Sequence, residues 1–253
     1  SRAVDMKRLT MRSLARVFAR RVAPTPPASA SASRRGGARC AMHASAAASS
    51  ASAGGVAYAR TMKWVDEFIV AKDVCPFARA PREAADPRGL DVHVIHGDAS
   101  LESVIESVVS RAIDLQTSIA DARFNRRGGK TSLVVAPECV ELASFDAFLD
   151  VMHVCEGVFA DVGLEGDVQV VGFHPEYKFH GEEATDAAAF TNRSPYPMFH
   201  LLRECDVARA SGESDIGELL NRNASMLREI GSSRLNEDLE RLRRGDFDGA
   251  SAN

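Results

Sequence analysis

The stretch Asp91-Val92-His93-Val94-Ile95-His96-Gly97-Asp98-Ala99-Ser100-Leu101 decides the fold of this chain. Its first six residues predict a strand. Ser100 is placed to cap a helix that begins at the next residue, with the acidic Glu102 in its first turn. Apolar residues then recur three and four positions apart, which is the spacing of one helical face. We therefore expect a strand followed directly by a helix, whose buried side carries Leu101, Val104, Ile105, Val108, Val109 and Ala112.

Strands and helices continue to alternate beyond this stretch. A second strand is predicted over Thr131–Ala136 and a third over Asp167–Phe173. Ser144 can cap the helix between them, and Gly163 suits the left-handed position that follows a helix. Strands that alternate with helices are joined by crossovers and form parallel sheets. We expect an α/β fold with a small, mostly parallel sheet of about three strands and crossover helices, the later helix burying Phe145, Phe148, Leu149, Met152, Cys155 and Phe159.

Further helical patterns flank this alternating region. A stripe at Val65, Phe68 and Ile69 predicts a helix before the first strand, and the pattern stops at Cys75-Pro76. A last helix is predicted over about 215–230, which makes the C-terminal segment helical. We expect a single α/β domain over residues 61–231, followed by a charged tail over 232–253 that is partly helical or disordered.

The N-terminal residues differ from the rest in charge. Residues 1–60 contain 11 Lys or Arg and one acidic residue, whereas the remainder has a net charge of −14. An Arg-, Ala- and Ser-rich segment almost free of acids is typical of an organelle transit peptide. Because Arg39-Cys40-Ala41 resembles a plastid processing region, we expect residues 1–60 to be a transit peptide and disordered linker that directs the protein to the chloroplast, with the mitochondrion as the alternative. A disordered tail with a basic nucleic-acid patch is another interpretation.

Composition also bears on partners. The acidic body argues against nucleic-acid binding. No stretch reaches the ~18–20 apolar residues of a membrane span. The cysteines of the body show no C-x-x-C spacing, so neither a disulfide framework nor a zinc ribbon is indicated. These cysteines are Cys75, Cys139, Cys155 and Cys205. The sequence does not indicate a particular cofactor.

His174 is a candidate catalytic residue because of its place after a strand. In open parallel sheets, ligands bind beyond the carboxyl ends of the strands. His174 follows the third predicted strand directly and precedes Pro175-Glu176-Tyr177-Lys178-Phe179. The alternative is a histidine that caps the strand end and bonds to backbone groups.

His200 is interpreted from a helical pattern after Pro197. In a helix beginning there, Met198, Leu201, Leu202 and Cys205 share one face, and His200 lies roughly opposite, able to pair with Glu204 one turn away. A histidine in the core is therefore not expected. It is either a solvated surface residue or a member of a polar site.

The loop before that predicted helix is stiff and polar. Pro195 and Pro197 restrict the backbone around Asn192, Arg193 and Ser194. The free N–H groups of a helix start, together with a guanidinium, would bind a carboxylate or a phosphate. Alternatively, Arg193 clamps the loop to an acidic side chain.

Cys75 lies between a predicted helix end and Pro76, with Arg79 four residues on. A nearby cation lowers the pKa of a thiol and makes the thiolate a nucleophile. The alternative is an inert, packed cysteine.

Three blocks of the sequence carry a resemblance to a known family. They are Cys75-Pro76-Phe77-Ala78-Arg79, Phe173-His174-Pro175-Glu176-Tyr177-Lys178-Phe179, and Thr191-Asn192-Arg193-Ser194-Pro195-Tyr196-Pro197-Met198 with His200-Leu201-Leu202-Arg203-Glu204. With them the chain resembles the bacterial and plastid proteins of the domain-of-unknown-function 1415 family over roughly residues 61–231. The resemblance implies a compact α/β domain and no established activity. Members usually have Tyr where this chain has Phe190.

Three functional hypotheses fit these residues. The first is an enzyme acting on a small anionic substrate, with catalytic Cys75, His174 and His200. Its substrate-binding residues would be Asn192, Arg193, Ser194 and Tyr177. The second is a non-catalytic binding or assembly factor in the plastid. The third is a metal-dependent enzyme with ligands among His174, His200, Cys75 and Glu204, although no short ligand spacing supports it.

Overall fold

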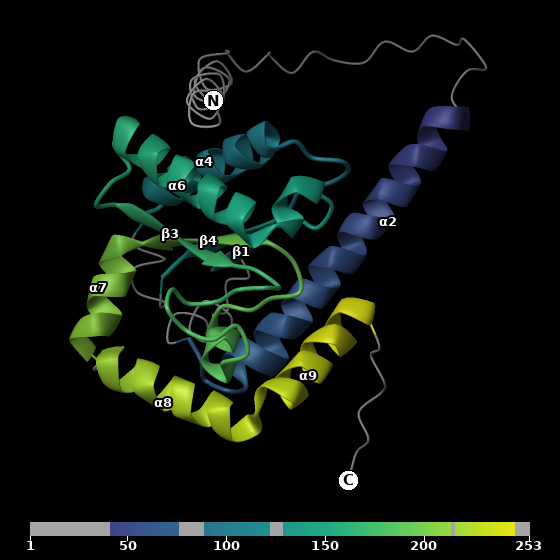
Figure 1. Cartoon of the computed structure of the whole chain (residues 1–253). Coiled ribbons are helices and arrows are strands. Elements are labelled where there is room, and N and C mark those ends of the chain that lie inside the picture. Colours follow the sequence, from purple (N-terminus) through teal and green to yellow (C-terminus); the bar gives the residue numbers. More distant parts are fainter. Residues whose placement is uncertain (1–40, 76–88, 122–128, 214–215, 246–253) are drawn as a thin grey trace.

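The computed structural model describes residues 41–75, 89–121, 129–213 and 216–245. A single four-stranded sheet forms its centre, in the order β1-β2-β4-β3. The strands span Leu90–Val94 (β1), Thr131–Val135 (β2), Val168–Phe173 (β3) and Met198–Arg203 (β4). Helices cover both faces of the sheet, so the fold is α/β in three layers (Figure 1).

The three strands predicted from the sequence are present, but the expectation of a mostly parallel three-stranded sheet is corrected by β4. β1 and β2 pair in parallel, with Val92 opposite Leu133. β4 pairs antiparallel with both β2 and β3, and His200 lies opposite Leu133 on one side and Val171 on the other. Consequently β1, β2 and β3 all run in one direction, and β4 lies between β2 and β3 and runs antiparallel to them.

β4 also corrects the helix predicted after Pro197. All six of its residues are buried. A central strand that is covered on both faces has apolar residues at successive positions, and such a run fits a helical period as well as a strand. His200 is therefore a core residue, and Glu204 begins the next helix instead of pairing with it.

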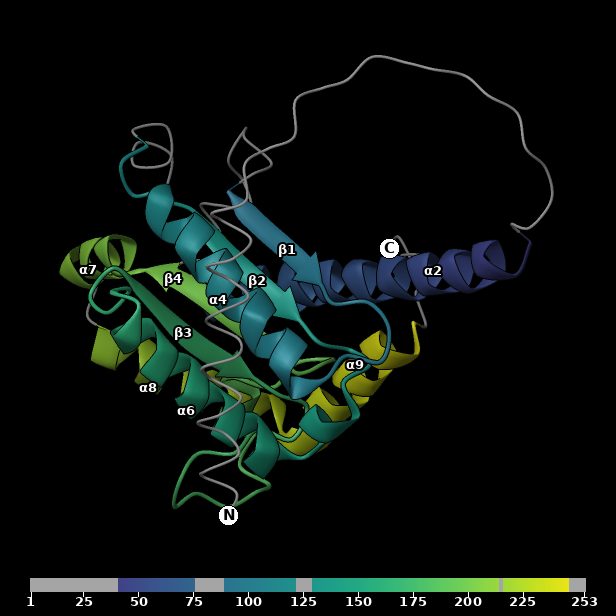
Figure 2. The same cartoon turned by 90° about the horizontal axis from the view of Figure 1, so that it is seen from above.

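The first face of the sheet is covered by α4 (Leu101–Thr117) and α6 (Phe145–Asp161), as Figure 2 shows from above. Both predicted caps are confirmed: the side chain of Ser100 accepts from Ser103 N–H, and that of Ser144 accepts from Ala147 N–H. Gly163 has the expected positive φ of 74°. In α6 the buried face differs in detail, because Leu149 is exposed and Met152 half-buried, while Val151 and Val158 are fully buried.

The second face is covered by segments from both ends of the described chain. The long helix α2 (Ala41–Trp64) continues into the π-helical turn η1 (Val65–Val70). It lies beside α9 (Ser232–Arg244), which follows α8 (Ile216–Ile230) (Figure 1). The part of the charged tail that is described is thus a docked helix. Its buried side chains are Leu235, Leu239 and Leu242.

Short elements complete the fold. α7 (Glu204–Glu213) follows β4. The single turn η2 (Val140–Ala143) follows β2, and the single turn η3 (Ala187–Thr191) precedes the Pro-containing loop. Because β1 to β3 share a direction, the residues after β2 and β3 and those before β4 meet at one edge of the sheet. Among the described helices, none has the length and apolar character needed to cross a bilayer.

Candidate functional site

A cleft of about 690 Å³ lies at this carboxyl edge of the sheet. Its walls come from the segment after β2, the segment 174–178 after β3, the Pro195-Tyr196-Pro197 turn before β4, and α9. The place agrees with the expectation that ligands bind beyond the carboxyl ends of parallel strands. Of the candidate residues from the sequence, His174 and Arg193 line this cleft.

Arg193 is held at the cleft by neutral oxygens. Its Nε–H donates to the carbonyl of Tyr177 at 3.1 Å, Nη2 donates to the carbonyl of Ala184 at 2.7 Å, and Nη1 reaches Asn236 Oδ1 at 3.4 Å. The guanidinium also lies 4.5 Å from the centre of the Phe190 ring. Burial lowers the pKa of Arg193, and the charge of Glu176 offsets this only in part. Arg193 clamps the loop, as the alternative interpretation held, but through carbonyl and amide oxygens instead of a carboxylate.

Other charged side chains surround Arg193 in the cleft. Glu176 and Lys178 are exposed and flank Tyr177, whose ring packs against Phe145 at a centroid distance of 5.3 Å. Within the described residues, neither the Glu176 carboxylate nor the Lys178 ammonium has a hydrogen bond or ion pair. Arg243 on α9 donates to Glu240 at 2.8 Å. These four residues were not among the candidates expected from the sequence.

His174 has a structural role in this arrangement. Its Nε2 lies 2.8 Å from the carbonyl of Leu142, and its Nδ1 accepts from the backbone N–H of Glu176 at 3.0 Å. This pair of contacts fixes the neutral tautomer with the proton on Nε2. The side chain is 1 % exposed, and burial lowers its pKa. These contacts match the alternative of a strand-end histidine bonded to backbone, and both ring nitrogens are occupied.

The remaining residues predicted for substrate binding brace the loop. Asn192 Nδ2 donates to the carbonyl of Gly172 at 3.1 Å. Ser194 is fully buried, and its hydroxyl donates to the carbonyl of Tyr196 at 2.6 Å. The carbonyl of Tyr177 accepts from Arg193, and burial raises the pKa of the Tyr177 hydroxyl. None of these side chains lines the cleft.

Cys75 and His200 meet at a different place, on the face of the sheet that α2 covers. Both line a small pocket of about 40 Å³, together with Trp64 and Phe173. His200 Nε2 lies 2.5 Å from the hydroxyl of Thr131, and burial lowers the His200 pKa to about 4. The structure thus places Cys75 beside His200 and apart from the cleft residues His174 and Arg193. Arg79, which was expected to activate Cys75, lies outside the described residues.

A metal centre finds no support in the described part of the chain, where no three or more His, Cys, Asp or Glu residues are grouped as ligands would be. The two histidines proposed as ligands face opposite sides of the sheet. His174 packs against Phe145 and Phe148 of α6, whereas His200 packs against Phe173.

Sequence reasoning missed the contribution of α9 and of Lys178. Asn236, Glu240 and Arg243 are spaced four and three residues apart, next to a buried leucine stripe with the same spacing. This pattern is typical of an amphipathic helix that docks on a domain, and it was the signal available in residues 232–244. The charges that surround Lys178 could not be predicted from the sequence, because its neighbours in the cleft come from distant segments.

Comparison with known proteins gives one family. The model of the DUF1415 family, described as a protein of unknown function, matches residues 56–237. Neither the curated proteins nor the solved structures gave a match.

Proposed function

Because this chain belongs to the DUF1415 family, whose description records no activity, we propose a function from the cleft itself: the protein binds a small organic anion there. The observation that carries the proposal is the half-buried guanidinium of Arg193, whose hydrogen bonds all go to neutral oxygens. A ligand anion would supply the countercharge.

The energetics favour this interpretation of Arg193. Moving a charge out of water is costly unless an opposite charge accompanies it. A guanidinium has five N–H donors. Three of them are used here: Nε–H bonds to Tyr177, one N–H of Nη2 to Ala184, and one N–H of Nη1 to Asn236. One N–H on Nη1 and one on Nη2 are not used by these contacts, and we propose that an anion in the cleft accepts from them. Lys178, exposed and without an ion pair among the described residues, adds a second positive charge on the same cleft.

The same geometry favours binding over the Cys/His chemistry considered from the sequence. Proton transfer requires a nitrogen within reach of the substrate, and both nitrogens of His174 are bonded to backbone groups. Cys75 and His200 line the small pocket instead of the cleft. The proposal therefore assigns ligand binding to the cleft and no reaction.

Lys178→Ala tests the proposal with little risk to folding, because the Lys178 side chain is exposed. Wild type and variant are compared by thermal shift and calorimetry against mono- and dicarboxylates, sulfonates and phosphate monoesters. We expect at least one class to raise the melting temperature by mass action, and Lys178→Ala to weaken that binding while the ligand-free melting temperature stays unchanged.

Lys72→Ala is the matched control. Lys72 lies next to η1, 6.0 Å from the centre of the Phe68 ring and outside the cleft. The control is expected to bind as wild type does. Absence of binding by every anion, or equal losses in the two lysine variants, would refute an anion site in the cleft.

A further inference from the structure

The cleft carries separated charges of both signs. Glu176 lies in the turn after β3, which the Tyr177 N–H closes on the carbonyl of His174 at 3.1 Å, and Lys178 follows two residues later. Both line the cleft, yet no ion pair joins them or ties either to another described residue. Tyr177 lies between them and does not line the cleft. Its ring packs against Phe145 and Phe179 at centroid distances of 5.3 and 5.2 Å, which holds this segment in place.

The wall formed by α9 adds a second carboxylate. Glu240 accepts from Arg243 through Oε1 at 2.8 Å, and no hydrogen bond to Oε2 is found among the described residues. The carbonyl oxygen of the Asn236 amide faces Arg193, which leaves its N–H₂ group as a donor. Acceptor oxygens from Glu176 and Glu240 therefore share the cleft with the cationic groups of Lys178 and Arg193.

We infer that the ligand carries hydrogen-bond donors, an ammonium or hydroxyl groups, in addition to its anionic group. This inference rests on the proposed function and specifies the class of molecule. The anionic group pairs with Lys178 and Arg193, and the donors bond to the carboxylates of Glu176 and Glu240. A second anionic group on the ligand is disfavoured, because it would lie near these carboxylates. A cleft of about 690 Å³ has room for both ends of such a molecule.

Hydrogen bonds to a charged partner contribute more than neutral ones, about 1.5–3 kcal/mol each. Removing the charge of a carboxylate that receives a ligand donor should therefore weaken binding by about tenfold or more. A ligand that has the same anionic group but no donor should bind the variant as tightly as wild type. It should bind more tightly if the removed negative charge had repelled it.

Three probes that differ only at one end test the inference: ethyl phosphate, hydroxyethyl phosphate and aminoethyl phosphate. Their dissociation constants are measured by calorimetry on the full chain. We expect wild type to prefer at least one of the two donor-bearing esters over ethyl phosphate by about tenfold or more. Preference for the ammonium or for the hydroxyl identifies which donor the cleft takes.

Glu176→Gln and Glu240→Gln then locate the donor end. Both side chains are exposed, so neither change is expected to disturb folding, which the ligand-free melting temperature verifies. At least one variant should lose most of the preference for donor-bearing esters while binding ethyl phosphate as tightly as wild type or more tightly. Glu165→Gln, at an exposed carboxylate outside the cleft, is the control.

The outcomes distinguish the anion site from the preference for ligand donors. If none of the three phosphates and no other small anion binds, the proposed function itself fails. If ethyl phosphate binds as well as the donor-bearing esters, or if their preference persists in both glutamine variants, the anion site stands and the inference about donors is overturned.

Discussion

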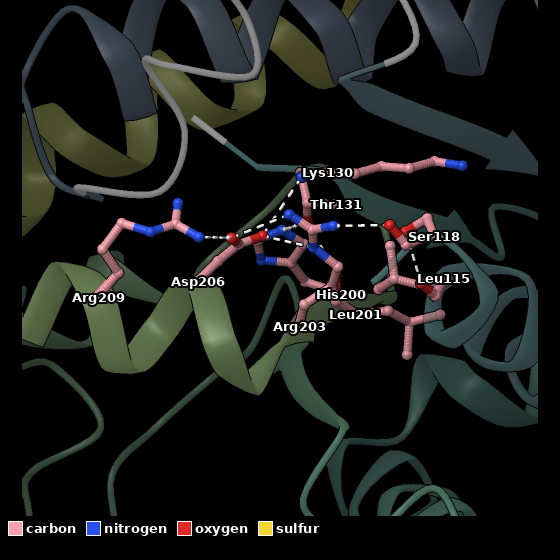
Figure 3. A network of polar contacts seen from close by, with 9 residues as sticks. All are labelled: Leu115, Ser118, Lys130, Thr131, His200, Leu201, Arg203, Asp206 and Arg209. Carbon is pink, nitrogen blue, oxygen red and sulfur yellow. Dashed lines mark hydrogen bonds and ion pairs between the residues drawn. The ribbon is translucent and has the colours of Figure 1, made fainter. Parts of the chain in front are cut away.

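Replacing Asp206 with Asn is expected to destabilise the protein strongly, because it leaves the fully buried charge of Arg203 without its carboxylate partner. Arg203 at the end of β4 is 0 % exposed. Its Nε donates to Asp206 Oδ2 at 2.6 Å and its Nη2 to Oδ1 at 2.9 Å, as Figure 3 shows. Among the described residues, the other acceptor of this guanidinium is the carbonyl of Ser118 at 3.1 Å.

The magnitude follows from the loss of one charge of a buried pair. Breaking such a pair by removing one partner costs about 3–5 kcal/mol. Asp206 also accepts from the Lys130 N–H at 3.4 Å, which joins the start of β2 to α7. Because the free energy of unfolding of a domain is only about 5–15 kcal/mol, Asp206→Asn is expected to remove a large part of it. Urea unfolding followed by circular dichroism measures this as a lower midpoint at an unchanged slope.

Arg209→Ala is the matched control, since Arg209 Nη2 contacts the same Asp206 Oδ1 at 2.9 Å while its side chain is 40 % exposed. Exposed pairs contribute about 0–1 kcal/mol, so this variant should unfold close to wild type. The double variant Arg203→Met with Asp206→Leu removes both charges and should cost much less than Asp206→Asn alone. Equal midpoints for Asp206→Asn and Arg209→Ala would refute the reasoning.

Three further predictions concern other parts of the molecule. The pKa of His200 in the folded state is lowered to about 4, so the unfolded chain binds a proton at higher pH than the folded one. The free energy of unfolding should therefore fall by about 3 kcal/mol as the pH drops from about 6.5 toward 4. His200→Gln should lack this component of the pH dependence in urea titrations, and an identical pH profile would contradict it. Leu239→Ala on α9, at a side chain 7 % exposed, should cost about 2–3 kcal/mol, whereas a charged tail that does not dock would show no loss. Residues 1–60 fused to a fluorescent reporter should carry it into chloroplasts, and a reporter that stays in the cytosol would refute the transit-peptide assignment.

Local patterns in the sequence were enough to predict much of the fold. The caps at Ser100 and Ser144 bond to backbone N–H groups three residues away, and the positive φ of Gly163 ends a helix. These features depend on residues close together in the chain, so they can be read without tertiary information. The strands β1, β2 and β3 were also predicted to within one or two residues at either end.

The candidate site was predicted only in part, for a reason that two residues illustrate. His174 was expected beyond the end of a strand and Arg193 in a loop that binds an anion, and both line the same cleft. Their roles depend on partners far away in sequence: Leu142 and Glu176 occupy the nitrogens of His174, and Asn236 contacts Arg193 across 43 residues. Spacing along the chain carries no information about such contacts.

By itself, the sequence determined the strands β1 to β3, the N-terminal caps of α4 and α6, and the contrast between a basic N-terminal segment and an acidic body. Only the tertiary structure decided that β4 is a strand, because residues 198–203 are buried on both faces and their apolar pattern fits either periodicity. It also decided which charged side chains have no ion pair among the described residues. Burial and charge compensation are properties of segments brought together by folding, and folding is what places Arg193 and Lys178 in one cleft beside α9.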